Sequence, residues 1–308
     1  MPYPLYIISG ISGSGKTTVG KIVATKIQTD ERRAVFVDED SYYVEDTPLI
    51  QLSNGTRTAN WDCIEAIDPK TIDEIKLFLE KSPVVLVGFA LPRKFLTIPG
   101  VVHIHLVTAY NPEDLYIRCR EARQQAKPSI NQERDQLMVR EVVIPFYHEV
   151  VRNSDISHLV DVFDQNGKRI PLDDIVQTCL NIIQDSTKPR LTYHKMDVSQ
   201  PYFDLIKSGR KLVEGRKISP AWKKVRRGDM ITMTCNGADS FNVIVTAISL
   251  YLPSIGDPLG AYLTCETLDR TLPGVFHMEE GRKIYLQWST EEEIKKMGMM
   301  GIQVNILE

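Results

Sequence analysis

A glycine-rich stretch near the N-terminus constrains the possible fold more than any other feature of this sequence. It fits the phosphate-binding pattern G-x-x-x-x-G-K-[ST] at every fixed position, as Gly10-Ile11-Ser12-Gly13-Ser14-Gly15-Lys16-Thr17-Thr18. The apolar run 5–8 before it predicts a strand, and the apolar spacing over 19–27 after it predicts a helix. A strand, a glycine-rich turn and a helix in this order predict an α/β domain with a parallel sheet.

The residue types in this stretch suit a nucleotide phosphate and its magnesium ion. Glycines let the backbone wrap closely around phosphate oxygens, and the N–H groups at the helix N-terminus face the negative charge. Lys16 can reach the terminal phosphates, and the hydroxyl of Thr17 can ligate magnesium. A surface turn that matches by chance is the alternative. We expect ATP and Mg2+ as cofactors, with ATP held by Gly10, Ser12, Gly13, Ser14, Gly15, Lys16, Thr17 and Thr18.

Three carboxylates follow the second predicted strand, which covers residues 33–37. The segment reads Asp38-Glu39-Asp40-Ser41-Tyr42-Tyr43, and α/β sheets place their ligands at such strand ends. A carboxylate near a γ-phosphate can take the proton of an attacking hydroxyl or hold magnesium. A solvated acidic loop is the alternative, and the neighbouring phosphate-binding pattern favours the functional interpretation.

The rest of the first half continues the α/β pattern. Unbroken apolar runs at 84–87 and 101–107 are typical of strands buried in a parallel sheet. A helical pattern covers 131–152, and we expect Pro145 to kink it.

Two groups of side chains in this half allow both a functional and a structural interpretation. His103 and His105 share one face of a predicted strand. Without a third ligand at a clear spacing, we expect them to be packed or hydrogen-bonded rather than to bind a metal. Arg118, Arg120 and Arg123 lie on one predicted helix. They can neutralise phosphates, or they can form an ordinary solvated helix face.

The first half resembles the uridine kinase and nicotinamide riboside kinase group of P-loop kinases, over residues 3–185. Besides the phosphate loop, four segments carry the resemblance: Asp40-Ser41-Tyr42-Tyr43, 60–68, Arg118-Cys119-Arg120 with Arg123, and Val143-Ile144-Pro145-Phe146-Tyr147. The resemblance implies that Asp40 is the catalytic base, that Asp62 holds the substrate ribose and that Tyr43 contacts the substrate. It further implies a lid whose charges stabilise phosphoryl transfer, formed by Arg118, Arg120 and Arg123.

One departure from that family concerns the magnesium site. These kinases usually carry an acid in the third strand, where this chain has Val87 followed by Gly88. We therefore expect Thr17 and Asp38 to be the magnesium ligands, with Glu39 as another carboxylate that can compensate. The missing acid puts the kinase activity in question.

The length of 308 residues suggests two domains, and the sequence pattern changes at a polar linker. This linker, 184–190, contains a proline, and it divides the chain into domains 1–187 and 190–308. In the second domain, strand-like runs alternate with turn signals. Strands are expected at 230–234, 241–245, 283–288 and 301–306, with a hairpin signal at Asn236-Gly237 and a capped helix at 290–296. This pattern predicts a small, mostly antiparallel β-barrel with peripheral helices.

A polar cluster marks the second domain as a possible site. Lys211, Glu214 and Arg216 are spaced by three and two residues, and a lysine with a shifted pKa can act as an acid, a base or a nucleophile. Trp222 lies nearby and can stack on a base. Eight cations gather here: Arg210, Lys211, Arg216, Lys217, Lys223, Lys224, Arg226 and Arg227. A salt-bridged barrel mouth with a solvated basic loop is the alternative.

The second half resembles the ASCH family, a branch of the PUA-like barrels, over residues 191–308. It fits the motif G-x-K-x-x-E-x-R as Gly209, Lys211, Glu214 and Arg216, and Gly228-Asp229 follows as the usual G-D. The family is associated with RNA: some members remove the acetyl group from N4-acetylcytidine, and others are linked to RNA cleavage, so the resemblance allows an amidohydrolase or a ribonuclease activity. The deacetylating bacterial members carry a threonine where Glu214 stands here, and Glu266 is a loose match to their second-site glutamate.

Composition excludes several classes of protein. The net charge of −3 gives no global argument for nucleic acid, so any RNA binding must be local. The five cysteines are scattered and form no C-x-x-C pair, which argues against a disulfide framework and a zinc site. No apolar run is long enough to span a membrane, and the N-terminus has no signal-peptide pattern, so we expect a cytoplasmic protein without membrane contact.

Together these features predict an ATP-dependent phosphotransferase fused to an ASCH domain. The expected acceptor is a hydroxyl of a nucleoside-like small molecule, and the barrel is expected to bind or process RNA or a modified nucleoside, with Lys211 and Glu214 as candidate catalytic residues and Arg216 on the substrate. The alternative is an RNA-binding or RNA-processing protein in which the nucleotide-binding domain only regulates the barrel. The sequence leaves the acceptor and the oligomeric state open.

Overall fold

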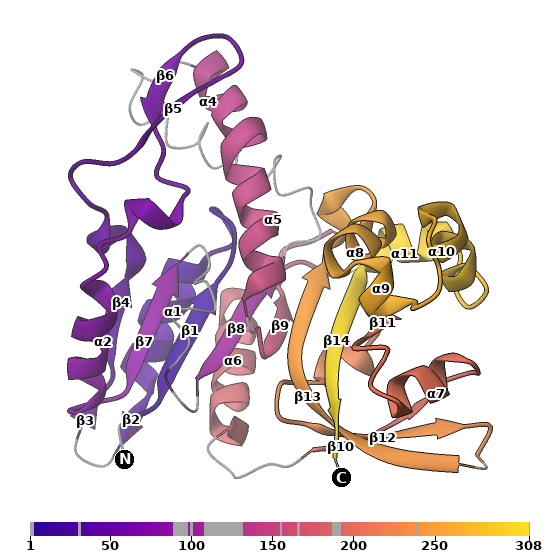
Figure 1. Ribbon diagram of the computed structural model, residues 1–308. Coiled ribbons are helices and arrows are strands. Elements are labelled where there is room, and N and C mark those ends of the chain that lie inside the picture. Colours follow the sequence, from indigo (N-terminus) through magenta and orange to yellow (C-terminus); the bar gives the residue numbers. More distant parts are fainter. Residues whose placement is uncertain are drawn as a thin grey trace. The chain divides into compact units, whose positions relative to one another are not determined.

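The computed structural model describes residues 3–29, 32–88, 98, 101–107, 132–154, 156–164, 167–186, 192–237 and 239–307. The chain divides into two compact units, Met1–Lys188 and Pro189–Glu308 (Figure 1). The three predicted lid arginines, Arg118, Arg120 and Arg123, lie outside the described residues. Within the described part of the chain, no helix combines the length and the apolar character needed to cross a bilayer.

The first unit is built on a parallel sheet. Among the described residues this sheet has five strands in the order β4-β7-β1-β8-β9, and every neighbouring pair is parallel. The strands are β1 (Leu5–Ser9), β4 (Val35–Asp38), β7 (Val84–Gly88), β8 (Val102–Val107) and β9 (His158–Asp161). Two short hairpins accompany it: β2 (Gln28–Thr29) with β3 (Arg32–Arg33), and β5 (Leu49–Gln51) with β6 (Arg57–Ala59). The predicted parallel α/β sheet is confirmed.

Helices cover both faces of this sheet, which explains why its strands are apolar without alternation. Tyr6 and Ile8 of β1 belong to a core shared with α1 (Lys16–Lys26) and α6 (Leu172–Ser186). Leu5 and Ile7, which point to the opposite face, belong to a second core with α2 (Thr71–Leu79). Each such aliphatic side chain contributes roughly 1.5–3 kcal/mol by its burial. The carboxyl ends of the strands therefore meet at one polar edge, where the glycine-rich loop leaves β1.

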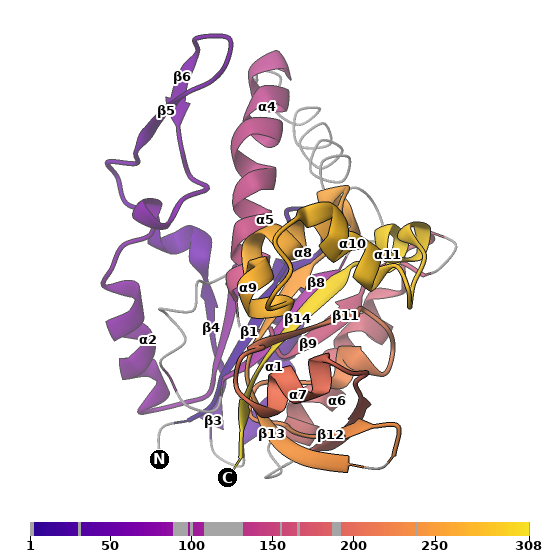
Figure 2. The ribbon, with the colours of Figure 1, turned by 45° about the vertical axis from the view of Figure 1, so that its right-hand side comes forward.

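A single π-helical turn interrupts the long helical segment shortly before Pro145. The segment consists of α4 (Gln132–Met138), this π-helical turn (Val139–Val143) and α5 (Ile144–Asn153), which follow one another in Figures 1 and 2. Proline has no N–H for the carbonyl four residues earlier, and its ring crowds that carbonyl. The wider turn directly before Pro145 accommodates both effects. The carboxylate of Glu141 in this turn accepts hydrogen bonds from Ser53, in the loop of the β5–β6 hairpin.

The second unit is built on a curled, mostly antiparallel sheet, a half-barrel. Its strand order is β10-β12-β13-β14-β11 among the described residues, and only the β10–β12 pair is parallel. The strands are β10 (Tyr193–Asp197), β11 (Val213–Lys217), β12 (Met230–Cys235), β13 (Asp239–Tyr251) and β14 (Met299–Ile306). The predicted hairpin is confirmed: β12 pairs with β13, and Asn236 and Gly237 between them take φ of 49° and 73°, the left-handed region that glycine and asparagine adopt most readily.

Five helices accompany this sheet in the described part of the unit, and one of them corrects a prediction. They are α7 (Tyr202–Lys207), α8 (Pro258–Glu266), α9 (Leu268–Thr271), α10 (Met278–Tyr285) and α11 (Glu291–Met297). The capped helix after Thr290 is confirmed, with both hydrogen bonds of a capping box between Thr290 and Glu293. The strand predicted at 283–288 is wrong. Its first half, 283–285, belongs to α10, because Tyr285 packs into the core that includes residues of α8 and α11.

Candidate functional site

The glycine-rich loop has the backbone that an anion site needs. Gly13 and Gly15 have φ of 91° and 94°, a left-handed conformation that glycine adopts without strain. α1 begins directly at Lys16, and its first turn holds no acidic residue. The unsatisfied N–H groups of this turn and the positive end of the helix dipole therefore face the loop, where a phosphate binds favourably.

Residues from separate segments of the first unit line one cavity of about 850 Å³. Of the residues predicted from the sequence, nine line it: Ser12, Gly13, Gly15, Lys16, Thr17, Thr18, Asp40, Tyr43 and Asp62. Gly10 and Ser14 lie behind this wall, where a Cβ atom on Gly10 would come within 2.6 Å of Ser14 Oγ. Asp38 is half-buried and does not line the cavity. Its pKa is raised, first by burial and then by the nearby charge of Asp40.

The cavity wall also contains residues that the sequence did not single out. Trp61 makes an edge-on contact with Tyr43, at 5.3 Å between ring centroids, and keeps 43% of its surface exposed. Arg134 and Asp135 of α4 also line the cavity and pair with each other at 3.2 Å. In the sequence, the position of Trp61 directly before Asp62 could have indicated that it lines the cavity. No local sequence pattern predicts that Arg134 and Asp135 line the cavity, because packing between distant segments brings α4 to it.

The structure also shows what surrounds the strand position where the family's acid is missing. Val87 is fully buried, and its side chain fills the space beside Gly20 of α1. Glu39 is buried as well, and its carboxylate lies against Gly88 at the end of β7, where a Cβ atom would come within 1.9 Å of Oε2. Gly88 is the register partner of Ser9, the residue just before the loop. A carboxylate is therefore present at this strand end, but it comes from the segment that follows β4.

A buried hydrogen-bonded chain lies beneath the loop. Ser9 Oγ contacts His103 Nε2 at 2.6 Å and His105 Nδ1 at 2.8 Å, and His105 Nε2 contacts the hydroxyl of Tyr147 at 2.9 Å. The described residues contain no group of three or more side chains that could hold a metal ion. The prediction that both histidines are hydrogen-bonded is confirmed. Burial lowers the pKa of each to about 3, with a further contribution from His105 on His103 and from Lys16 on His105.

These histidines should make the first unit less stable at mildly acidic pH. Their pKa values are near 6.5 in an unfolded chain and about 3 in the fold, so protonation favours unfolding. Above pH 6.5 both histidines are neutral in the folded and the unfolded chain, so they do not lower the free energy of unfolding. As the pH drops from 6.5 toward 3, that free energy falls by up to about 1.36 kcal/mol per pH unit for each histidine. Hydrogen–deuterium exchange of the β1 and β8 amides should show reduced protection at pH 5 relative to pH 7.5.

The control for this prediction uses the exposed His277 of the second unit. His277→Gln should leave the pH dependence of β1 and β8 protection unchanged, whereas the double variant His103→Gln/His105→Gln should flatten it. Equal protection at both pH values in the unmodified chain would contradict the assignment of these histidines as neutral.

The second unit holds a separate cavity of about 440 Å³ around the predicted polar cluster. Lys211, Glu214 and Arg216 all line it, so the structure brings the three together as the spacing suggested. Glu214 and Arg216 point the same way from β11, while Gly215 between them faces the hydroxyls of Tyr262 and Tyr285. Aromatic side chains form much of the remaining wall: Tyr202, Trp222, Tyr285 and Trp288.

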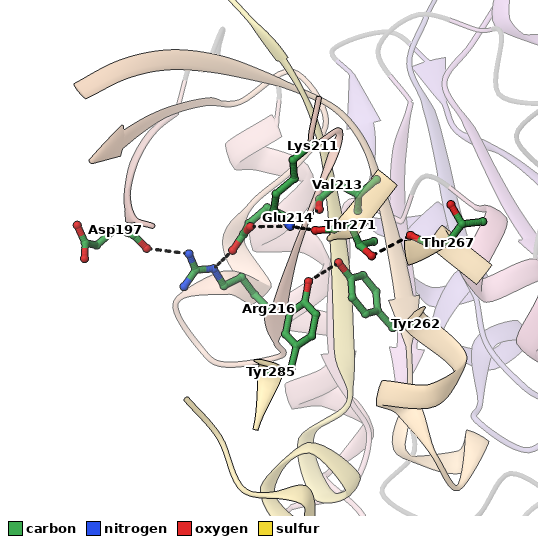
Figure 3. A network of polar contacts seen from close by, with 9 residues as sticks. All are labelled: Asp197, Lys211, Val213, Glu214, Arg216, Tyr262, Thr267, Thr271 and Tyr285. Atoms are coloured by element: carbon green, nitrogen blue, oxygen red, sulfur yellow. Dashed lines mark hydrogen bonds and ion pairs between the residues drawn. The ribbon is translucent and has the colours of Figure 1, made fainter. Parts of the chain in front are cut away.

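The cluster forms one chain of polar contacts (Figure 3). Lys211 Nζ lies 3.3 Å from Glu214 Oε2 and 3.0 Å from the carbonyl oxygen of Val213, and it also donates to the carbonyl oxygen of Thr271. These three acceptors match the three hydrogens of an ammonium group. Burial lowers the pKa of Lys211, and the adjacent Glu214 carboxylate opposes that shift.

Arg216 holds the other side of the same carboxylate. Its Nε lies 3.0 Å from Glu214 Oε1, its Nη2 donates to the carbonyl oxygen of Asp197 at 2.8 Å, and its guanidinium lies 5.5 Å from the ring centre of Trp222. Glu266, the loose match to a second-site glutamate, does not line the cavity. It accepts from the hydroxyl of Tyr251 at 2.8 Å and pairs with Arg270.

Comparison with protein families decides the class of the second unit. Residues 196–299 match the family model described as the ASCH domain. The second unit contains an ASCH domain. The resemblance drawn from the G-x-K-x-x-E-x-R motif is thereby confirmed, and the paired Lys211, Glu214 and Arg216 are the motif residues that line the cavity of the ASCH domain.

Solved structures similar to this chain fall into two groups. The crystal structure of the hypothetical protein PH0355 shares 31% identity over 38% of this chain and 100% of its own, with a TM-score of 0.34. Protein PF0455 from Pyrococcus furiosus shares 29% over 38% of this chain and 99% of its own, with a TM-score of 0.32. The other group includes a gluconokinase from Sinorhizobium meliloti 1021, at 16% identity over 60% of this chain and 93% of its own, with a TM-score of 0.35. A sugar kinase from Janibacter sp. HTCC2649 shares 16% over 59% and 95%, with a TM-score of 0.36. No curated protein matches.

Proposed function

We propose that the first unit transfers the γ-phosphoryl group of ATP to a hydroxyl of a nucleoside-type acceptor. The observation that carries this proposal is the shared cavity: the glycine-rich loop, Asp40 and Asp62 come from three segments and line the same space. Phosphoryl transfer depends chiefly on positioning and on electrostatic stabilisation. A loop for the phosphates and two carboxylates from other segments on the wall of the same cavity meet that requirement.

In this proposal each side chain has a defined task. Lys16 and the loop N–H groups bind the phosphates and neutralise their charge. The acceptor hydroxyl oxygen forms a bond to the γ-phosphorus, the bond to the β–γ bridging oxygen breaks, and Asp40 takes the hydroxyl proton. The products are ADP and the phosphorylated acceptor. Lid residues Arg118, Arg120 and Arg123 remain candidates for stabilising the transferring charge.

The residues around Thr17 suit the magnesium ion that ATP brings. The hydroxyl of Thr17 lines the cavity and offers an oxygen ligand, which Mg2+ prefers, and the carboxylate of Asp38, which does not line the cavity, is the second ligand that the sequence suggests. When bound, the ion would neutralise charge on the phosphate oxygens. Asp38 lies close enough to Lys16 for its pKa to respond to that charge, so an acid and the phosphate-binding lysine belong to one electrostatic site.

The cavity residues outside the glycine-rich loop favour a nucleoside over a simple sugar. Tyr43 and Trp61 supply aromatic surface for a planar ring. Asp62 and Asp135 supply carboxylates that can accept hydrogen bonds from ribose hydroxyls. Incubating the full chain with ATP, Mg2+ and a panel of ribonucleosides, deoxyribonucleosides, gluconate and simple sugars tests this, with mass spectrometry as the readout. We expect a phosphorylated ribonucleoside; product from gluconate or a sugar alone would contradict the acceptor class.

For the second unit we propose binding of single-stranded RNA, with one base or a modified nucleoside in the cavity of the ASCH domain. The supporting observation is the cavity's combination of four aromatic side chains with one fixed carboxylate. Aromatic faces stack on bases, and a buried carboxylate can accept from their N–H groups. Because Lys211 already has three acceptors, we assign it to positioning Glu214 rather than to nucleophilic chemistry. If no acceptor is phosphorylated but RNA binding changes when ATP is added, the alternative gains support that nucleotide binding by the first unit only regulates the ASCH domain.

RNA binding should depend on salt through the cations beside Trp222. If Lys223 and Lys224 contact phosphates, each alanine substitution should make the log–log slope of affinity against salt shallower by about 0.7. Fluorescence anisotropy of a labelled single-stranded RNA between 50 and 200 mM salt measures this slope. Lys76→Ala is the matched control, since Lys76 is an exposed, ion-paired lysine of the first unit. A slope that Lys223→Ala and Lys224→Ala leave unchanged would place the RNA elsewhere.

A further inference from the structure

We propose that the cavity of the ASCH domain selects guanine, read along the edge that carries its N1–H and N2–H groups. This inference rests on the proposed binding of RNA or a nucleoside in that cavity and names the base. At Glu214 the protein leaves hydrogen-bonding capacity unused.

Glu214 is held in a single orientation with acceptor capacity to spare. Its side chain is 9% exposed, Oε2 pairs with Lys211 and Oε1 pairs with Arg216 Nε. A carboxylate has about four lone-pair sites, so one remains on each oxygen after these two contacts. The carboxylate lines the cavity. It therefore presents two adjacent acceptors to a ligand, with their direction fixed from both sides.

Two adjacent acceptors distinguish guanine from the other bases. Guanine carries two parallel N–H donors, N1–H and N2–H, whose separation matches the two oxygens of a carboxylate. Adenine, cytosine and uracil each offer only one ring-edge N–H position next to an acceptor atom. Bringing one of those acceptors against a buried carboxylate oxygen would leave both without a hydrogen, which is costly inside a protein.

Arg216 supplies the complement to the third group on that edge. Its Nη2 donates to the carbonyl oxygen of Asp197, and its Nε pairs with Glu214. Within the described part of the chain, the N–H groups of Nη1 have no such contact and can donate to a ligand. Guanine O6 accepts hydrogen bonds, and arginine is its usual partner. A carboxylate and a guanidinium held side by side thus match two donors followed by one acceptor.

The walls and the volume of the cavity can accommodate a single base. The guanidinium of Arg216 is fixed over Trp222 at 5.5 Å, and Tyr202 meets Trp288 edge-on at 6.4 Å. Trp288 keeps 55% of its surface exposed, so it offers a face at the cavity mouth for a neighbouring base. The cavity of about 440 Å³ lies within the range of about 300–1,000 Å³ typical of small-molecule sites.

The test uses fluorescence from the ASCH domain alone. The chain has three tryptophans, and Trp222 and Trp288 both line this cavity, so a Trp61→Phe full-length chain reports only on it. The probes are short single-stranded RNAs of uridines with one central guanosine, inosine, adenosine, cytidine or uridine. Inosine retains N1–H and O6 but lacks the N2 amino group. We expect guanosine to bind tighter than inosine by roughly tenfold or more, the loss of one hydrogen bond to a charged acceptor, and tighter than the other three.

The outcomes separate the base assignment from RNA binding itself. Equal affinity for all five RNAs would overturn guanine selection while leaving RNA binding intact, and preference for cytidine or adenosine would overturn it as well. Absence of binding by any probe would overturn both. Glu214→Gln should abolish the preference for guanosine over inosine, whereas Glu293→Gln, at the exposed partner of Lys217, should keep it. The inosine comparison needs no variant of the site, so it remains decisive if Glu214→Gln impairs folding.

Discussion

Asp40→Asn is expected to slow phosphoryl transfer by about 10²–10⁴-fold while ATP binding stays close to that of the unmodified chain. Asp40 lines the same cavity as Lys16 and Thr17. Asparagine keeps the shape of the side chain but cannot take the proton of the acceptor hydroxyl, and general-base catalysis supplies a factor of this size. Single-turnover phosphorylation of the acceptor found in the panel measures the rate, and calorimetry measures the binding of ATP.

Lys16→Ala supplies the contrast for this experiment. Removing the lysine should weaken ATP binding as well as turnover, since Lys16 contacts the bound phosphates in both the ground state and the transition state. Glu45→Gln is a matched control, because Glu45 is another carboxylate on the wall of this cavity and the proposal gives it no role. If Asp40→Asn turned over at the rate of the unmodified chain, Asp40 would not be the base.

Glu214→Gln is expected to destabilise the ASCH domain by about 3–5 kcal/mol. The substitution leaves the ammonium of Lys211, which is 2% exposed, without its only charged partner among the described residues. Removing one member of a buried ion pair has a cost of this size, because the remaining charge is no longer compensated. Urea unfolding followed by the fluorescence of Trp222 and Trp288, in the Trp61→Phe chain, measures the change in the free energy of unfolding of this domain.

A double variant shows whether the cost comes from the uncompensated charge. Lys211→Met removes the ammonium, so Lys211→Met/Glu214→Gln should recover much of the stability that Glu214→Gln loses. Glu293→Gln removes a carboxylate from the exposed pair with Lys217 and should behave like the unmodified chain. If the double variant were less stable than Glu214→Gln alone, the shape of the lysine side chain rather than its charge would stabilise the domain.

Local sequence patterns were enough to predict much of the first unit and its glycine-rich loop. Strands such as β7 are apolar at every position because both faces of a parallel sheet are covered, and the glycine-rich motif fixes the turn and the helix that follow β1. Glu214 and Arg216 could be placed together because alternate residues of a strand share a face. Lys211 joins them from outside the strand, three residues before Glu214.

The features that the sequence did not predict depend on packing between distant segments. The segment 283–288 alternates like a strand, but the core around Tyr285 selects a helix that ends there. Arg134 and Asp135 reach the cavity only through the path of α4, and no local pattern reports that path.

The contact between Glu39 and Gly88 has a consequence for how this sequence can vary. Any side chain at position 88 would occupy space that the carboxyl group of Glu39 already fills. A side chain at position 88 therefore requires either that the carboxyl group of Glu39 moves away from the strand end or that position 39 carries a smaller residue. Among relatives that carry this arrangement, the two positions should covary, with a side chain at one accompanied by a short residue at the other.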